Sequence, residues 1–233
     1  MKPYPHLFFD LDHTLWDFDT NAQLTLHQLY QDFDLGQQWD ASREAFIEAF
    51  FVVLHQLWDD YNHARITKDQ LRTWRFPRIA ERLTGRKFDP MPELEATYQQ
   101  WGSSQPGLMP YAHQTLEDLH RKGYKLHILT NGFQESQYTK LEASGIAHFF
   151  DTLTTSECTG KTKPDPAIFA HALDKSGAGP GEVILIGDNP STDLEGAAAA
   201  GWDAVFYNPQ QKPTQSPFRY HVQCLRELSR IFD

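Results

Sequence analysis

From residue 110 onward, strand-like and helix-like segments alternate along the chain, and this alternation constrains the fold more than any other feature of the sequence. Strands that alternate with helices pair in parallel, because each right-handed crossover returns the chain to the same end of the sheet. The helices then cover both faces of the sheet. The sequence therefore predicts an α/β fold with a doubly wound parallel sheet. The predicted elements are helices near 110–122, 134–144, 165–176, 191–200 and 220–232, and strands at 125–130, 149–153, 183–186 and 204–207.

An apolar run at Leu7–Leu11 predicts one further strand, which a long helical stretch separates from the alternating region. Apolar periodicity is helical over most of the roughly ninety residues that follow the run. The Gly- and Ser-containing segment 102–107 is typical of a linker that returns to the sheet. We therefore expect residues 1–15 and 106–233 to form one sheet domain, and residues 16–105 to form an inserted helical domain.

Two helices of the insertion can be placed from the sequence. Apolar residues recur at three- and four-residue steps between Ala45 and Tyr61, which predicts a helix packed against other helices. Thr67 is a suitable N-cap for a second helix, and Gly85 is a suitable stop. Pro77 lies between them and is expected to kink or divide that helix.

Charge and composition restrict the partners of the protein. The chain carries a net charge of −10 and no run of basic residues, so the basic stripe typical of nucleic-acid binding is missing. No apolar segment approaches the length of a bilayer span, and Met1–Tyr4 leads into a strand-like run instead of a signal-peptide core. The two cysteines and 11 histidines show no zinc-ligand spacing. We expect a cytoplasmic protein that acts on a small molecule and binds neither nucleic acid nor membrane; its oligomeric state is not predicted.

Polar residues follow several predicted strands, at the points where these strands end. In an open parallel sheet, the ligand site lies beyond the carboxyl ends of the strands. Each of these residues alone has an ordinary interpretation, as a turn residue, a helix cap or a solvated surface charge. Their common position at one predicted sheet edge favours a shared site. The residues are Asp10, Asp12, Thr130, Asn131, Gly132, Lys163, Asp188 and Asp193.

The chemistry that needs this set of side chains is phosphoryl transfer through a covalent intermediate. A carboxylate nucleophile is repelled by a phosphate dianion unless a hard cation bridges them, and Asp10 and Asp188 can hold Mg²⁺ for that purpose. Asp12 can protonate the leaving oxygen and later deprotonate a water molecule. The Thr130 hydroxyl and the Lys163 ammonium can bind the remaining phosphate oxygens.

Four segments in order, "DLDHT", "LTNG", "KTKPDP" and "GDNPSTD", resemble the motifs of the haloacid dehalogenase (HAD) superfamily of phosphohydrolases. The resemblance implies a Rossmann-like core, an α-helical cap of the C1 type inserted after the first motif, and aspartyl-phosphate chemistry with Mg²⁺. It implies Asp10 as the nucleophile, and Asp12 as the acid/base, which would also bind the metal through its backbone carbonyl. It further implies Thr130 as the phosphate-binding hydroxyl, Lys163 as the stabilising lysine and Asp188 as a metal ligand.

The loops around these motifs hold further candidates. Asn131 and Gly132 complete the second motif and are expected to bind the substrate phosphate, and Asp193 is an additional acidic residue of the fourth. The third motif holds two lysines. Lys163 directly precedes Pro164 and matches the family better than Lys161 does. His13 stands where the superfamily often has glycine.

A narrower resemblance concerns the substrate. The segments "LTNGFQESQYTKLEASGIAHFFD" and "SECTGKTKPDPAIF", and the cap stretch "WDDYNHARITKDQL", resemble the house-cleaning pyrimidine 5′-nucleotidase branch of the superfamily. The resemblance implies hydrolysis of nucleoside 5′-monophosphates, including damaged or non-standard pyrimidines. Trp16 and Phe18 follow the first motif closely and are our candidates for stacking on the base.

Other functions share parts of this pattern. A phosphosugar phosphatase or a phosphomutase would carry the same four motifs and differ only in the cap. A 2-haloacid dehalogenase needs neither a metal nor Asp12, and a non-catalytic binding module would not need the full set of motif residues. The sequence therefore favours a phosphatase over the last two, whereas short motifs do not fix its substrate.

Overall fold

The computed structural model describes residues 4–233. Residues 1–3, on which part of the argument against a signal peptide rests, lie outside the described residues. The chain divides into two compact units, which are described here one at a time. The sheet unit comprises Met1–Phe18 and Pro106–Asp233, and the helical unit comprises Asp19–Gln105.

The boundary between the first strand region and the helical unit lies after Phe18, whereas the sequence places it after Leu15. Trp16 forms a β-bridge with Leu108 and packs in the main core of the sheet unit. These contacts attach the segment after the first motif to the sheet unit.

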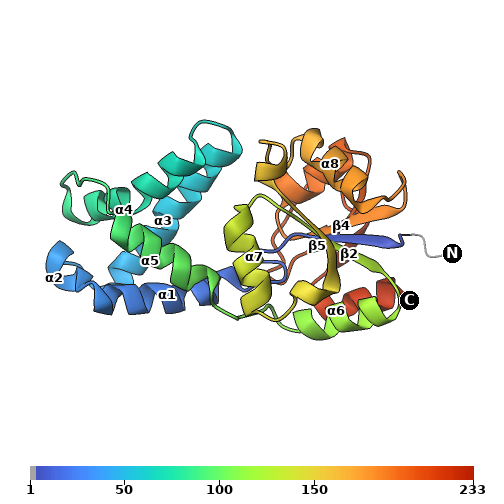
Figure 1. The fold of residues 1–233 in the computed structure, drawn as a ribbon, viewed down its shortest axis with the longest axis horizontal. Helices are drawn as coiled ribbons and strands as arrows, with labels where there is room; N and C mark the ends of the chain where they lie inside the picture. Colours follow the sequence, from blue (N-terminus) through green and yellow to red (C-terminus); the bar gives the residue numbers. More distant parts are fainter. Residues whose placement is uncertain (1–3) are drawn as a thin grey trace. The chain divides into compact units, whose positions relative to one another are not determined.

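A six-stranded parallel sheet forms the centre of the sheet unit (Figure 1). The strand order is β3-β2-β1-β4-β5-β6, and every neighbouring pair is parallel. The order runs outward from β1 in both directions, which confirms the predicted doubly wound, Rossmann-like sheet. The strands are β1 (His6–Phe9), β2 (Lys125–Thr130), β3 (Phe150–Thr155), β4 (Val183–Gly187), β5 (Asp203–Tyr207) and β6 (Tyr220–Val222).

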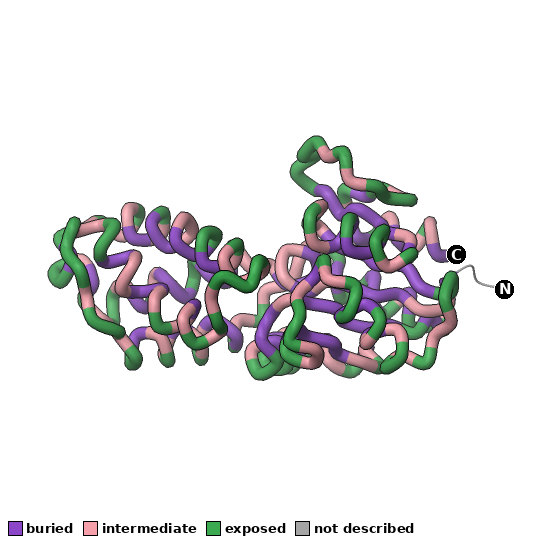
Figure 2. Tube along the Cα trace, turned by 90° about the horizontal axis from the view of Figure 1, so that it is seen from above, coloured by how far each residue is buried: buried purple, intermediate pink, exposed green. Residues whose placement is uncertain are grey.

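Helices cover both faces of this sheet, and Figure 1 shows α6 on one side and α8 on the other. Side chains of a strand alternate between the faces, so Leu7 and Phe9 pack in one core with residues of α6, α7 and α10, while Phe8 packs in a second core with residues of α8 and α9. Buried segments run through the middle of the unit (Figure 2). The helices are α6 (Ala112–Arg121), α7 (Gln134–Ala143), α8 (Pro166–Ser176), α9 (Glu195–Ala199) and α10 (Leu228–Ile231).

The first strand is shorter than predicted at its carboxyl end. It stops at Phe9 instead of Leu11, because the chain turns there and the backbone N–H groups of Leu15 and Trp16 both donate to the Leu11 carbonyl. Leu11 is nevertheless buried in the main core. The early turn leaves Asp10 as the first residue beyond the strand.

The predicted helix at 220–232 is wrong over its first part. Tyr220–Val222 forms the edge strand β6, and α10 begins only at Leu228. In this short strand, His221 is exposed and Val222 is buried, an alternation with the period of a strand. Pairing with β5 therefore overrides the helical reading of these residues.

The helical unit consists of five helices, and the first of them begins one residue before the unit, at Phe18. The apolar stripe between Ala45 and Tyr61 lies in α3, as predicted, and its inward side chains are buried. The helices are α1 (Phe18–Asp32), α2 (Leu35–Trp39), α3 (Arg43–Asn62), α4 (Lys68–Thr84) and α5 (Pro92–Ser103).

Helix α4 has the predicted ends but not the predicted division. Thr67 accepts from the Gln70 amide, and Gln70 accepts in return from the Thr67 amide, which together make a capping box. Gly85 ends the helix with a φ of 70°, a left-handed conformation that glycine adopts without strain. Pro77 lies inside a continuous helix, because buried apolar residues on both sides of it pack the helix into the unit.

The helical unit contains one deeply buried ion pair. The Arg75 side chain is only 3% exposed, and its Nη1 lies 2.8 Å from Glu95 Oε1. Gln99 Nε2 donates to the same carboxylate at 2.8 Å, and the Arg75 guanidinium lies 4.6 Å from the centre of the Tyr98 ring. Burial raises the pKa of Glu95, and Arg75 partly offsets that effect.

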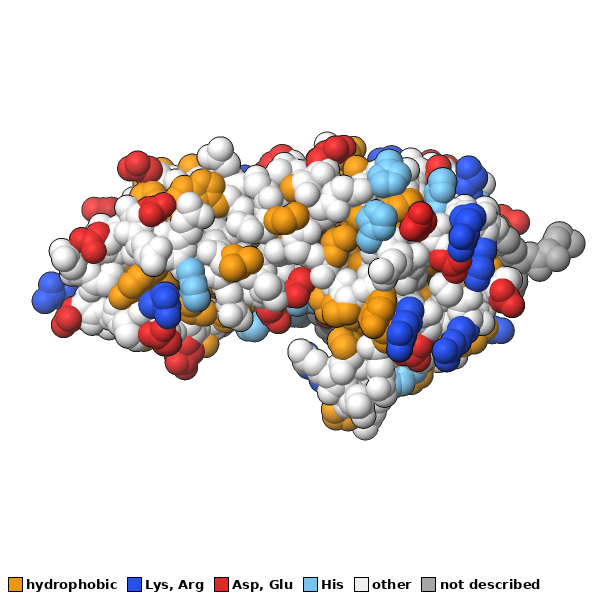
Figure 3. Space-filling view, turned by 90° about the horizontal axis from the view of Figure 1, so that it is seen from below, with side chains coloured by type: hydrophobic (Ala, Val, Ile, Leu, Met, Phe, Trp, Pro, Cys, Tyr) orange, Lys and Arg blue, Asp and Glu red, His pale blue; other side chains and the backbone are white. Residues whose placement is uncertain are grey.

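Surface charges of opposite sign are interspersed. On the face shown in Figure 3, Lys and Arg side chains of the sheet unit lie among Asp and Glu side chains. Exposed pairs such as Arg121 with Asp118, 2.7 Å apart, are typically worth about 0–1 kcal/mol. Within residues 4–233, none of the helices combines the length and the apolar character that crossing a bilayer requires.

Candidate active site

The carboxyl ends of three neighbouring strands bring the first candidates together. Asp10 directly follows β1, Thr130 is the last residue of β2, and Asp188 directly follows β4. Because β1 lies between β2 and β4, these residues share one edge of the sheet. The Asp10 amide donates to the Ile186 carbonyl at 2.9 Å, which fixes the end of β1 against β4.

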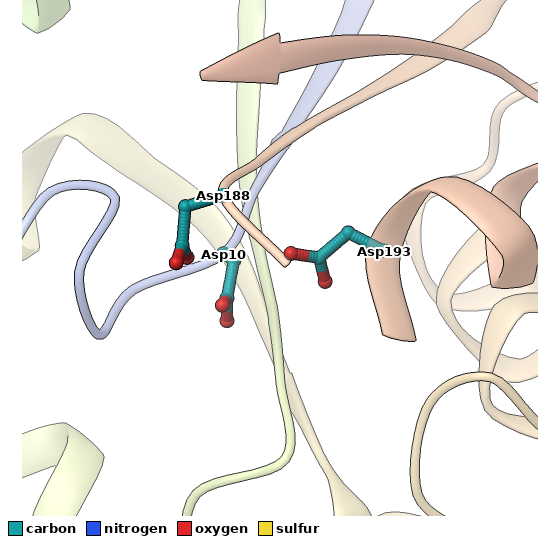
Figure 4. A group of neighbouring side chains, drawn as sticks. All are labelled: Asp10, Asp188 and Asp193. Carbon is teal, nitrogen blue, oxygen red and sulfur yellow. The ribbon is translucent and has the colours of Figure 1, made fainter. Parts of the chain in front are cut away.

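Three aspartates form a carboxylate cluster at this edge (Figure 4). Asp10, Asp188 and Asp193 each offer one oxygen that lies within 4.8 Å of the other two. Asp193 comes from a π-helical turn at Pro190–Leu194, which precedes α9. Gly187 permits this approach, since a Cβ at that position would lie 2.3 Å from Asp193 Oδ2. Asp193 is therefore part of the cluster and not an ordinary residue of a helix start.

A buried lysine lies against this cluster. Lys163 Nζ is 2.9 Å from Asp10 Oδ1 and 2.7 Å from Asp193 Oδ1, and it donates to the Leu129 carbonyl at 2.8 Å. Its side chain is 1% exposed. Lys161, the competing candidate, is exposed and pairs with a surface aspartate. The structure thus brings Lys163, and not Lys161, to the aspartates.

The cluster carries excess negative charge, because three carboxylates face one ammonium. Burial raises the pKa of Asp10 to about 7, with Asp193 and Asp12 adding to the rise and Lys163 opposing it. Burial also raises the pKa of Asp188 well above its usual range, with further contributions from Asp193 and Asp10. A divalent cation relieves such crowding, and carboxylate oxygens are ligands that Mg²⁺ prefers. The cluster therefore fits a metal site.

The carboxylate of Asp12 does not belong to this cluster. Lys140 Nζ donates to its Oδ1 at 2.5 Å, and Gln137 Nε2 donates to its Oδ2 at 2.9 Å. Burial opposes ionisation of Asp12, but Lys140 and Gln137 hold its pKa below the usual range. Because the chain leaves the extended conformation after Phe9, the Asp12 carboxylate reaches Lys140 and Gln137 on α7.

Gln137 and Lys140 are not among the site residues that the sequence motifs predict. Both lie on α7, where they form its buried face together with Leu141. Glutamine and lysine rarely occupy fully buried positions unless they are paired. The sequence did offer a signal for these two residues. They lie three positions apart, on the helix face that also carries the apolar Leu141.

The second motif supports the loop that carries the buried lysine. Thr130 is buried, and its Oγ1 accepts from the Gly132 amide at 3.1 Å. The Asn131 side chain donates to the Lys163 carbonyl at 3.0 Å and accepts from the Lys163 amide at 2.6 Å. Its amide group therefore ties the second motif to the third, and the contact of Asn131 with phosphate stays a prediction.

Two residues of the first motif complete the site. His13 has a φ of 61°, in the left-handed region where glycine is least strained, which explains why glycine suits this position. The Thr14 hydroxyl, which the sequence did not single out, donates to Asp188 Oδ1 at 3.1 Å. The first motif thus contacts the fourth through a side chain.

The two aromatic candidates for base stacking lie in different surroundings. Trp16 is 2% exposed in the core of the sheet unit, with its ring centre 4.4 Å from Lys140 Nζ. Phe18 is only partly buried, and its ring centre lies 5.0 Å from that of His13. Trp16 therefore leaves little surface for a ligand, and the base contact of Phe18 stays a prediction.

A doubly wound parallel sheet with buried carboxylates at its carboxyl edge defines a class of Rossmann-like enzymes that bind their substrates at that edge. Within this class, the chain belongs to the haloacid dehalogenase-like hydrolase family, whose model matches residues 4–201. The match includes all four motifs and the helical unit, and it confirms the resemblance seen in the sequence.

Relatives of known name extend over nearly the whole chain. The chain is 31% identical to pyrimidine 5′-nucleotidase PynA of Streptococcus pneumoniae, over 99% of this chain and 95% of that protein. It is also 31% identical to pyrimidine 5′-nucleotidase YjjG of Escherichia coli, over 97% and 96%. The magnesium-bound structure of the putative HAD-hydrolase YfnB from Bacillus subtilis is similar, with a TM-score of 0.86, 27% identity and 98% coverage of both chains. The chain is thus a member of a hydrolase family in which two full-length relatives are pyrimidine 5′-nucleotidases.

Proposed function

We propose that this chain is a Mg²⁺-dependent phosphatase that hydrolyses pyrimidine nucleoside 5′-monophosphates through a phosphorylated Asp10. The observation that carries the proposal is the cluster of Asp10, Asp188 and Asp193 around Lys163. The cluster holds more negative charge than one ammonium balances, at the sheet edge where ligands bind. A phosphate dianion is repelled from such a cluster unless a cation offsets the carboxylates.

Asp10 and Asp188 would hold the Mg²⁺, and the backbone carbonyl of Asp12 would be a further ligand. When bound, the ion offsets the charge that separates the phosphate from the carboxylate nucleophile. The raised pKa values of Asp10 and Asp188 support this assignment, because burial and, to a smaller extent, the neighbouring carboxylates disfavour the charged forms that a bound cation would stabilise. The YfnB structure, solved with magnesium, supports it from a relative.

The side chains divide the chemistry between them. A carboxylate oxygen of Asp10 bonds to phosphorus while the bond to the leaving oxygen breaks, and Asp12 gives that oxygen a proton. Asp12 then takes a proton from a water molecule that attacks phosphorus, the bond to Asp10 breaks, and phosphate leaves. Lys163 and the Thr130 hydroxyl stabilise the charge on the other phosphate oxygens. Asp193 holds the lysine for this task.

The nucleotide part of the proposal rests on the relatives, since PynA and YjjG are pyrimidine 5′-nucleotidases and match this chain almost from end to end. We assign selection of the substrate to the helical unit, because the chain enters it directly after the first motif. Phe18 is the last residue before that unit and is the proposed contact for the base.

The test is phosphate release by the purified chain from a matched panel of esters. The panel holds UMP, dUMP and dTMP, the purine nucleotides AMP and GMP, and the phosphosugar glucose 6-phosphate, each with Mg²⁺ and after chelation. We expect the highest kcat/KM for the pyrimidine nucleotides and loss of turnover after chelation. A preference for glucose 6-phosphate would favour a phosphosugar phosphatase, and metal-independent halide release from 2-chloropropionate would overturn the phosphatase mechanism.

The base contact is tested with two aromatic variants. Phe18→Ala should raise KM for dUMP at least several-fold, while KM for the small ester 4-nitrophenyl phosphate changes little, because only the nucleotide has a base to stack. Trp16→Ala is the matched comparison, since its ring packs in the core and its loss should affect both esters alike. Parallel losses in both variants would assign Phe18 to structure.

A further inference from the structure

The two side chains of α7 that hold Asp12 have no part in the function proposed above. Lys140 reaches Asp12 Oδ1 and Gln137 reaches Asp12 Oδ2, so each carboxylate oxygen has one donor. An ionised carboxylate oxygen has two lone pairs, so each keeps one for the substrate or a water molecule. The Asp12 carboxylate is thus held at both oxygens, and a free lone pair can carry the proton that Asp12 gives to the leaving oxygen and later takes from water.

Other residues of the sheet unit shape this arrangement from several sides. A Cβ on Gly132 would lie 1.5 Å from Gln137 Nε2, so only glycine there leaves space for the amide. The same Nε2 is 3.4 Å from Thr130 Oγ1. The Trp16 ring lies against the Lys140 ammonium at a distance typical of a cation–π contact. The pair is therefore part of a packed environment and not a chance contact of flexible side chains.

Stability alone does not account for these two residues. Gln137 is 1% exposed, and its Oε1 has no hydrogen-bond partner among residues 4–233, which lowers stability. A buried ion pair such as that of Lys140 and Asp12 contributes little net stability compared with apolar residues of similar volume. An apolar side chain at either position could pack as the neighbouring Leu141 does.

We propose that Gln137 and Lys140 are positioning residues that fix the orientation of the Asp12 carboxylate toward the leaving oxygen of the substrate. This inference rests on the proposed function, in which Asp12 moves the proton. Proton transfer needs a donor within hydrogen-bond reach of the leaving oxygen, and a carboxylate free to rotate about its side-chain bonds loses that geometry.

The experiment compares esters whose leaving groups differ in their need for a proton. 4-Nitrophenolate leaves readily without one, whereas the 5′-oxygen of dUMP leaves as an alkoxide and needs one. We expect Gln137→Met to lower kcat/KM for dUMP by about 10- to 100-fold and for 4-nitrophenyl phosphate by less than about threefold. Phenyl phosphate, with an intermediate leaving group, should show an intermediate loss.

Further variants separate positioning from a structural role. Lys140→Met should show the same split between esters, and Lys140→Arg should restore most of the dUMP activity, because it keeps a charged donor. If Gln137→Met does not fold, Lys140→Met decides the question. The matched control is Lys175→Met on α8, whose Nζ donates to the Leu153 carbonyl at 2.8 Å and whose loss should leave both esters unaffected.

Three results would overturn the inference. Equal losses on all three esters would assign the pair to structure, and unchanged dUMP activity in both Met variants would show that Asp12 needs no positioning. If the wild-type chain released no phosphate from any ester, the proposed function itself would fail, and this inference with it. If the wild-type chain hydrolysed the esters and the variants lost activity equally on all of them, only the positioning role would be overturned.

Discussion

Both units bury ion pairs, but only the cluster around Lys163 in the sheet unit carries excess negative charge. In the helical unit, Glu95 pairs with Arg75, and Arg72 also lowers its pKa. In the sheet unit, Lys163 faces both Asp10 and Asp193, and Asp188 adds a third carboxylate. The side chains of Arg75 and Lys163 are almost equally inaccessible to solvent. The units therefore differ in charge balance and not in burial.

This difference shows which buried charges indicate a site. A balanced pair satisfies its own electrostatic needs and is weak evidence for function. A buried excess of like charge is stronger evidence, because only proton uptake or a ligand from outside can relieve it. The four predictions below test this distinction, beginning with the largest expected effect.

The first prediction concerns the nucleophile in the charged cluster. Asp10→Asn should lower kcat by at least about 10³-fold, because an amide cannot form the phosphorylated intermediate. It also removes one of three crowded carboxylates, so the free energy of unfolding should stay the same or rise. Phosphate release and urea unfolding measure the two effects. Activity near that of the wild type would exclude Asp10 as the nucleophile.

The second prediction concerns the balanced pair of the helical unit. Arg75→Met should lower the free energy of unfolding by about 3–5 kcal/mol, because it leaves the Glu95 carboxylate buried without its partner. Adding Glu95→Leu should restore most of that stability. The exposed Arg121→Ala is the control and should lose less than about 1 kcal/mol. A loss as small as that of the control would remove the contrast between the units.

The third prediction concerns the missing compensation of the charged cluster. Mg²⁺ at 100 times its Kd should raise the free energy of unfolding by about 2.7 kcal/mol, because it binds only the folded chain. Asp188→Asn should lose most of this gain, while Lys161→Ala, which changes an exposed lysine of the loop that carries Lys163, should keep it. Urea unfolding with and without Mg²⁺ is the measurement. An equal gain in Asp188→Asn would place the ion elsewhere.

The fourth prediction concerns the histidine pair of His6 and His127, of which His127 is buried. His6 Nδ1 and His127 Nε2 lie 3.0 Å apart, and burial, with His6 adding, lowers the pKa of His127 to about 4. Lys125 lowers this pKa further and Asp151 raises it. His127 binds a proton more readily in the unfolded chain than in the folded one. Its contribution to the free energy of unfolding is therefore full above about pH 6.5 and is lost as the pH falls toward 4.

Between pH 7 and pH 5, the free energy of unfolding should therefore fall by about 2 kcal/mol on account of His127. His127→Gln removes the titrating group and should flatten this part of the stability curve. The measurement is urea unfolding of both proteins at pH 7, 6 and 5. Parallel curves would show that His127 does not set the acid sensitivity.

Sequence periodicity predicted most of the sheet unit, because strands such as Val183–Gly187 are apolar and are followed directly by polar residues. It failed for Tyr220–Val222, since three residues are too short for a pattern and only pairing with β5 reveals the strand. It also predicted a kink or a division of α4 at Pro77, and the division is absent because the rest of the helix packs on both sides of that residue.

The candidate site was predictable where residues follow strand ends, as Asp10 and Asp188 do. The roles of other residues depend on the fold in three dimensions. Nothing local shows that Asn131 holds the backbone of Lys163, 32 positions away, or that Lys140 reaches Asp12 across 128 positions. Such contacts become visible only when the loops are placed.

The short strand β6 also has a consequence for self-association. It pairs with β5, whose residues 204–207 are buried, and so covers backbone groups that would otherwise form an open apolar edge. The three residues of β6 present only a brief edge of their own, and Arg219 beside them adds a charge. During synthesis, β5 leaves the ribosome before β6, so its edge stays open to other chains until residues 220–222 arrive. Variants that weaken β6 should therefore favour aggregation of the newly made chain before they affect the distant carboxylate cluster.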